Sequence, residues 1–216
     1  MTQSRFQRVS AVSLALTGLL LAIFWITHAE TLADPVAYQR QHWLGLAGSL
    51  LLPVGLTGIG LRLLAVDAGT VGLVGFLLAF LSSLLSLAIS ATDAFVWPAI
   101  ARAQPELILT AAGVFDPDSP VYTSNFALIG AALPLVVVGY GALGLALWQS
   151  RAFSRPATIL LVLAAWATAF APGLVPHGAL LPKVLVYSPL AIALVWMGAQ
   201  LWRGDTQSER KGIAEP

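Results

Sequence analysis

The chain has 216 residues, of which 58% are hydrophobic and 10% are charged, compared with roughly 45–50% and about 25% in soluble domains. The formal net charge is only +1 and the basic residues are scattered, which excludes a nucleic-acid-binding surface. The sequence contains no cysteine, so disulfides, thiolate catalysis, iron–sulfur clusters and cysteine-ligated zinc are excluded. This composition predicts an integral membrane protein, with the lipid bilayer as its surroundings.

Long apolar runs determine the predicted fold. A hydrocarbon core about 30 Å thick requires about 20 helical residues, and backbone amides in lipid must be satisfied within the segment. The runs show no two-residue alternation typical of barrel strands. We predict an all-α integral membrane bundle of about six transmembrane helices, near residues 9–27, 43–61, 70–97, 125–148, 157–175 and 184–202. One transmembrane domain then covers residues 1–203, and residues 204–216 form a polar, disordered cytoplasmic tail.

The distribution of basic residues predicts the orientation. Short loops rich in Lys and Arg stay in the cytoplasm. With the N-terminus inside, the outer side carries only three basic residues, and the inner side carries Arg5, Arg8, Arg62, Arg151, Arg155, Arg203, Arg210 and Lys211. This favours N-in, C-in placement in a bacterial cytoplasmic membrane. The alternative is a cleaved signal peptide with Thr27-His28-Ala29 as the cleavage site, but the apolar stretch is longer than the usual 7–15 residues.

The larger loops fall on the predicted outer side, at residues 29–41 and 101–123. Within the second loop, the segment PELILTAAGVF begins with Pro105 and Glu106 and reaches Gly113 after about two turns. A proline and an acidic residue favour a helix start, and glycine favours its end. The pattern predicts a short interfacial helix here.

The third apolar run carries the best-ordered polar pattern. Ser82, Ser86, Ser90 and Asp93 recur at spacings of four, four and three residues, which places them on one helix face, with Trp97 one turn beyond. Small residues on one face favour close helix packing in membranes. The functional alternative is a polar path that leads to a carboxylate near the outer surface, where water can also solvate it.

All three histidines, His28, His42 and His177, fall near the predicted outer face. Such side chains commonly rest at a membrane interface. The functional alternative is a site in which neutral imidazoles bind a metal or haem iron, with Asp93 or Glu30 completing a metal shell. No short metal motif such as HExxH is present, so the sequence identifies neither a metal nor a cofactor.

The central part of each predicted helix lacks ionisable residues. Ion-coupled carriers and proton pumps usually carry such residues inside the span, so a charge-translocating carrier is disfavoured. The sequence also lacks a glycine-rich phosphate loop, a nucleophile elbow and paired catalytic carboxylates within a helix. These absences favour a non-enzymatic protein.

Several short motifs resemble those of uncharacterised bacterial multi-pass membrane proteins. They are HWLGL at residues 42–46, the glycine-rich run ending at Arg62, GLVGF at 72–76 and AFVWP at 94–98. The resemblance covers residues 40–105 and implies a bacterial multi-pass protein without implying any activity.

Two functions remain open on the sequence. The favoured one is a non-enzymatic bundle that binds a small apolar or amphipathic ligand or a membrane protein partner. The alternative is a His-dependent, haem- or metal-containing membrane oxidoreductase or metal-binding protein with an extracytoplasmic site. The candidate ligand-binding residues are His28, His42, Asp93 and Trp97, and the candidate packing stripe is Ser82, Ser86 and Ser90.

Overall fold

The computed structural model describes residues 3–28, 32–170 and 180–213. Helices make up nearly all of this described chain, in agreement with the predicted all-α class. In order they are α1 (Gln3–Thr27), α2 (Pro35–Ala65), α3 (Gly69–Ala91), a π-helical turn η1 (Thr92–Val96), α4 (Trp97–Ala103), a 3₁₀ turn η2 (Pro105–Leu107), α5 (Pro120–Ser150), α6 (Arg155–Phe170) and α7 (Leu180–Ile213).

Five stretches of the described chain are long and apolar enough to cross a membrane. They are Arg5–Thr27, Pro35–Ala65, Gly69–Ala103, Pro120–Ser150 and Leu180–Gly204. Helix α6 (Arg155–Phe170) is shorter, because the residues that directly follow it, 171–179, are not among the described ones. The last part of the predicted fifth span, up to residue 175, lies outside them.

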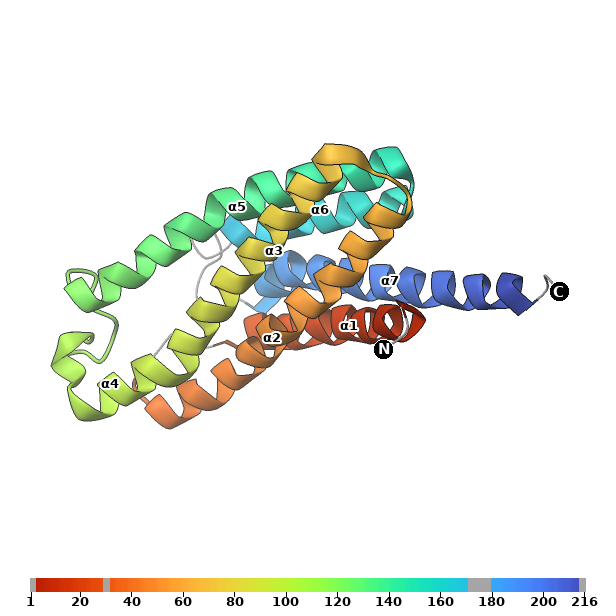
Figure 1. Ribbon diagram of the computed structural model, residues 1–216. Coiled ribbons are helices and arrows are strands. Elements are labelled where there is room, and N and C mark those ends of the chain that lie inside the picture. The colour runs from red at the N-terminus through yellow and green to blue at the C-terminus, as the bar shows by residue number, and fades with distance from the viewer. Residues whose placement is uncertain (1–2, 29–31, 171–179, 214–216) are drawn as a thin grey trace.

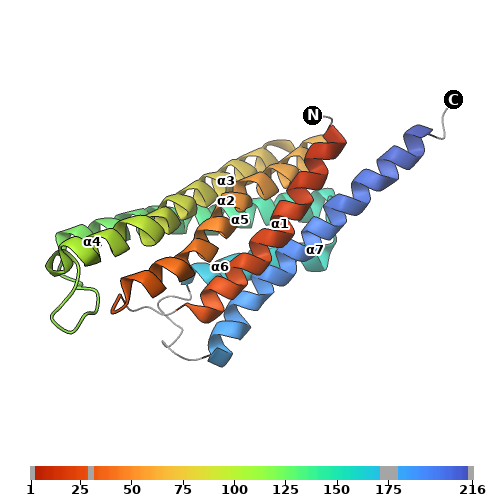
Figure 2. The same cartoon turned by 90° about the horizontal axis from the view of Figure 1, so that it is seen from below.

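The helices form a closed ring. Each packs on the next in the order α1, α2, α3, α5, α6 and α7, and α7 returns to α1. Both termini lie at one end of the bundle, together with the α2–α3 turn and the α5–α6 connection (Figures 1 and 2). We call this the terminal end. Helix α4 and the loop that follows it lie at the opposite end, which we call the loop end (Figure 1).

Glycines bring the helix backbones close together. A Cβ atom added at Gly75 would lie 2.3 Å from the backbone nitrogen of Leu143, and one at Gly139 would lie 2.6 Å from that of Ala79. Helices α3 and α5 therefore cross with almost no side chain between them, as small residues allow in membranes. The α1–α7 crossing has the same character, since a Cβ atom at Gly198 would meet the Ala11 carbonyl oxygen at 2.5 Å.

Two predicted boundaries move because polar residues also belong to helices. Helix α2 begins at Pro35, where the Asp34 side chain accepts hydrogen bonds from the backbone nitrogens of Val36 and Ala37, both at 3.0 Å. This N-cap and the proline start the helix well before residue 43, whereas the apolar run marks only the stretch without charge. The third helix continues past residue 97 as α4, after the π-helical turn.

The predicted interfacial helix in the second loop does not form. Only the 3₁₀ turn Pro105–Leu107 appears, and a bridge between Leu109 and Phe115 closes a small hairpin. The Thr110 backbone nitrogen donates to the Val114 carbonyl at 2.8 Å. Gly113 turns the chain with φ of 74°, a left-handed conformation that glycine adopts readily. Local turn geometry thus replaces the expected helix.

The C-terminal helix also differs from the sequence-based expectation. Helix α7 runs to Ile213, so its backbone continues past the predicted end at residue 202 and into the segment expected to be disordered from residue 204. The extension contains no proline before residue 216, so nothing in it prevents intrahelical hydrogen bonding. The apolar run therefore predicts the part of this helix that is long enough to cross a membrane, but it does not predict where the helix ends.

Candidate functional site

Two of the predicted histidines meet at the loop end. His28 follows the last residue of α1, and His42 lies in the third turn of α2. Their ring centroids are 4.7 Å apart with an interplanar angle of 82°. The connection between α1 and α2 is short, so the two helices are antiparallel neighbours and bring both imidazoles to one depth. The structure thus brings these two candidate residues into direct contact.

The His42 side chain is tightly enclosed. It is only 2% exposed and stacks on Tyr38 with 3.8 Å between ring centroids. Phe24 contacts it edge-on at 5.1 Å, and the Nδ1 atom lies 2.8 Å from the Tyr38 carbonyl oxygen. These contacts make His42 a packed part of the α1–α2 interface rather than the wall of an open cavity.

Helix α7 reaches the same cluster through a lysine. Lys183 is 8% exposed, and its Nζ atom donates to the His28 carbonyl oxygen at 2.6 Å. One turn further along α7, Tyr187 stacks on Trp25 with ring centroids 5.0 Å apart. Sequence analysis missed both contacts and used Lys183 only as an outer basic residue. Its position at the start of the last apolar run was the only available signal.

Asp93 and Trp97 also lie at the loop end, where their segment packs against α2. Asp93 is in the π-helical turn, and the Trp97 side chain, one turn on, is placed to donate a hydrogen bond to its carboxyl group. Trp97 is 3% exposed and packs in a buried cluster with Tyr38. Gln39 of α2 donates to the Ala94 carbonyl at 2.9 Å. Short π-helical turns within α-helices occur frequently at functional sites.

The described residues contain no group of three His, Asp or Glu side chains placed to hold a metal ion. Glu30 and His177, which the sequence offers as further ligands, lie outside the described residues. A porphyrin with two axial imidazoles needs its plane between them, and the direct contact between His28 and His42 leaves no space for that plane. The arrangement therefore does not resemble a haem site built on this pair.

The serine stripe follows the face of α3 that meets α5. Gly72, Gly75 and Ala79 are buried on this face, and Ser82 continues it at 2% exposure. Helical spacing extends the same face to the half-buried residues Ser86, Ser90 and Asp93. Toward the loop end α3 and α5 diverge (Figure 1). There Ser90 meets α2 instead, since its hydroxyl lies 2.9 Å from that of Ser49.

Helix α5 contributes a polar residue that sequence analysis treated only as the start of the fourth run. The aromatic rings of Tyr122 and Trp97 lie 6.0 Å apart and join α5 to α4. Asn125 is one turn further into α5, and Asp93 is one turn before Trp97, so both lie on the side of this contact that is nearer the middle of the bundle. Asn125 is 8% exposed, and its Oδ1 atom has no hydrogen-bond partner among the described residues.

Comparison with known proteins yields no match: no family model, curated protein or solved structure matches this chain. The bacterial family suggested by its short motifs therefore stays a prediction.

Proposed function

We propose that this protein is a multi-pass integral membrane protein of the bacterial cytoplasmic membrane that binds a small amphipathic molecule without transforming it. The ligand lies between α3 and α5 in the loop-end half of the bundle. Five long apolar helices in the described chain support the membrane location.

The basic residues support a cytoplasmic terminal end. Among side chains that the structure describes, this end carries Arg5, Arg8, Arg62, Arg151, Arg155 and Arg203, whereas the loop end carries Arg40, Arg102 and Lys183. Because Lys and Arg in short segments favour the cytoplasmic side, the loop end then faces outward.

The observation that carries the proposed site is the pair of polar side chains just inside the Trp97–Tyr122 contact. Asp93 belongs to the π-helical turn after α3 and Asn125 to α5, and an ionisable residue in a membrane-spanning segment suggests function by default. The Asn125 Oδ1 atom is a buried acceptor without a described partner. Leaving such a group unsatisfied is costly, so a ligand with a hydrogen-bond donor suits it.

The surroundings define the chemical class of the ligand. Near Asn125, helix α5 exposes the large apolar side chains Phe126 and Ile129, which suit an alkyl or aromatic tail. A carboxyl group at Asp93 suits a donor or a cationic headgroup. We therefore assign an amphipathic molecule with an amine or hydroxyl headgroup.

Binding of a dansyl-labelled long-chain alkylamine to the purified protein tests this proposal. Ser86→Trp places a bulky side chain on the polar face and should abolish the rise in dansyl fluorescence. The matched control, Leu84→Trp, adds the same side chain at a position that is 40% exposed and should preserve it. Asp93→Asn should weaken binding of the amine by about tenfold, since a charge-assisted hydrogen bond is lost. Unchanged binding in both Ser86→Trp and Asp93→Asn would refute the site.

A metal-binding role remains the second candidate because His28 and His42 are in direct contact. Two imidazoles at one point can supply half of a tetrahedral shell. Metal analysis of the purified protein and of the His28→Ala and His42→Ala variants tests it. Stoichiometric metal that disappears in both variants would favour this role, and metal-free protein would reject it.

A further inference from the structure

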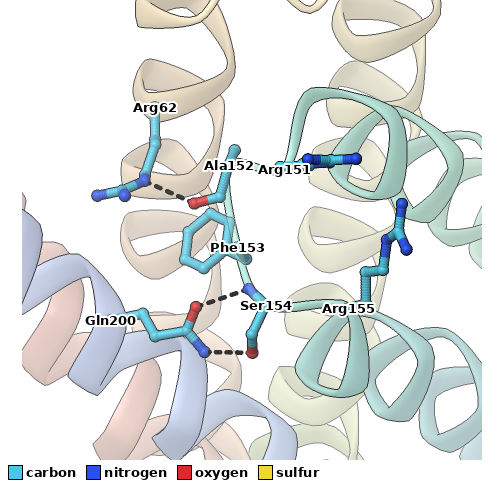
Figure 3. Close-up of a pocket in the computed structure, with 7 residues that line it drawn as sticks. All are labelled: Arg62, Arg151, Ala152, Phe153, Ser154, Arg155 and Gln200. Atoms are coloured by element: carbon cyan, nitrogen blue, oxygen red, sulfur yellow. Dashed lines mark hydrogen bonds between the residues drawn. The ribbon is translucent and has the colours of Figure 1, made fainter.

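A second polar site lies at the terminal end of the bundle, opposite the end that carries the ligand site proposed above. A hollow of about 520 Å³ is lined by Arg62 of α2, the connection from Arg151 to Ser154, Arg155 of α6 and Gln200 of α7. Figure 3 shows these side chains around the connection. Three of the lining residues are arginines and none is acidic.

The connection between α5 and α6 is held on both sides. The Arg62 Nε atom donates to the Ala152 carbonyl oxygen at 2.8 Å. On the other side, the Ser154 backbone nitrogen donates to Gln200 Oε1, and Gln200 Nε2 donates to the Ser154 hydroxyl, both at 2.8 Å (Figure 3). The connection is therefore anchored to α2 and α7, and the arginines at its two ends have fixed backbone positions.

These two arginines present like charges side by side. The side chains of Arg151 and Arg155 lie on the same side of the connection in Figure 3, and both residues are exposed. Arg151 adopts a left-handed conformation with φ of 55°, which is disfavoured for residues other than glycine. Asp67, in the turn after α2, lines a different hollow with Gly60 and Phe76. Two guanidinium groups beside a hollow whose described lining contains no acidic residue suit an oxyanion.

Two further features strengthen the attraction for an anion. Arg155 is the first residue of α6, so the positive end of the helix dipole lies at the same place. Its guanidinium group also lies 4.6 Å from the Trp148 ring centroid. A second arginine–tryptophan pair, Arg8 over Trp202 at 5.7 Å, lies at the same end. Tryptophan and arginine together are typical of the headgroup level of a membrane.

We propose that Arg151 and Arg155 form a binding site for a phosphate-class oxyanion. Arg62 and Gln200 are positioning residues, because they hold the connection that carries the two arginines. A guanidinium group can bind two phosphate oxygens at once, and basic pockets between membrane helices on the cytoplasmic side accept anionic headgroups. The phosphate belongs either to an anionic phospholipid or to a soluble phosphate compound. The proposal does not depend on the ligand site at the loop end.

Native mass spectrometry of the full-length protein in detergent tests this site with two probes, phosphatidylglycerol and inorganic phosphate. Phosphatidylcholine, whose zwitterionic headgroup has no net charge, is the reference. The double variant Arg151→Gln/Arg155→Gln should lose at least about tenfold in affinity for the anionic probe. The matched control, Arg5→Gln/Arg8→Gln, removes the same charge and also one arginine–tryptophan contact, and should lose less than about twofold. Arg151→Lys/Arg155→Lys keeps the charge and should show an intermediate loss, because lysine cannot bind two oxygens in a planar fork.

The two sources of phosphate give different results. Phosphatidylglycerol binding that millimolar inorganic phosphate does not displace identifies a lipid headgroup, and direct binding or displacement by inorganic phosphate identifies a soluble ligand. Either result supports the site if the Arg151/Arg155 variant loses it. Equal losses in the two glutamine variants would show general surface attraction and overturn the site, as would equal binding of phosphatidylglycerol and phosphatidylcholine without phosphate binding. The elution volume and far-ultraviolet circular dichroism of each variant establish that it is folded.

Discussion

The imidazole rings of His28 and His42 meet edge to face, 4.7 Å apart, although they belong to different helices. This contact joins the end of α1 to the third turn of α2, and Lys183 ties the start of α7 to the His28 backbone. Three helices are therefore fastened together at the loop end by polar and aromatic groups.

Replacing His42 with alanine should destabilise this junction. The side chain is 2% exposed and packs against Phe24 and Tyr38, so its removal leaves a cavity that costs about 2 kcal/mol or more. Thermal unfolding in detergent should show a clear fall in Tm. The neighbouring Trp43→Ala, at 51% exposure, is the control and should change Tm less. Equal shifts would indicate that His42 is not a packing residue.

Replacing Gly75 with alanine should weaken the α3–α5 crossing. The added methyl group would lie 2.3 Å from the Leu143 backbone nitrogen, so the helices must separate, at a cost of about 1–3 kcal/mol. Gly130→Ala on α5 is the control, because a Cβ atom there meets nothing within 4 Å. This variant should be neutral or slightly stabilising. Comparing the two melting temperatures measures the difference directly, and a Gly75→Ala protein as stable as wild type would contradict the close crossing.

The orientation can be tested by adding single cysteines to a chain that has none. Ala112 in the loop after α4 and Thr70 at the start of α3 are both exposed and lie at opposite ends of the bundle. With the terminal end in the cytoplasm, Ala112→Cys should react with an impermeant maleimide on intact cells. Thr70→Cys should react only after the membrane is opened. The reverse pattern would place the termini outside.

Replacing Ser119 with alanine should loosen the loop before α5. The Ser119 hydroxyl donates to the Leu107 carbonyl oxygen at 2.5 Å and accepts from the Tyr122 backbone nitrogen at 3.2 Å. Loss of this N-cap costs about 1 kcal/mol, so limited proteolysis should cleave the loop faster. Ser124→Ala removes only a bond to the Val121 carbonyl within α5 and should leave cleavage unchanged. Identical cleavage rates would mean that the cap does not hold the loop.

The site residues show how far sequence patterns reach. The spacing from Ser82 to Asp93 predicts a common helix face because helical geometry is local, whereas the contact between His28 and His42 depends on how α1 and α2 pack. Asn125 and Lys183 were missed, since each is a single polar residue at the edge of an apolar run. Their partners come from other helices, and only the packing of those helices reveals them.

The sequence by itself determines that the chain folds into long apolar helices, because hydropathy and backbone hydrogen bonding act within each segment. It also locates the charge-free part of each helix. The tertiary structure alone decides the order of helices around the ring, the crossing at Gly75 and the hollow bordered by Arg151 and Arg155. It also decides where α2 and α7 begin and end. These features depend on contacts between segments distant in the chain, and apolar composition specifies that a helix is covered without specifying which helix covers it.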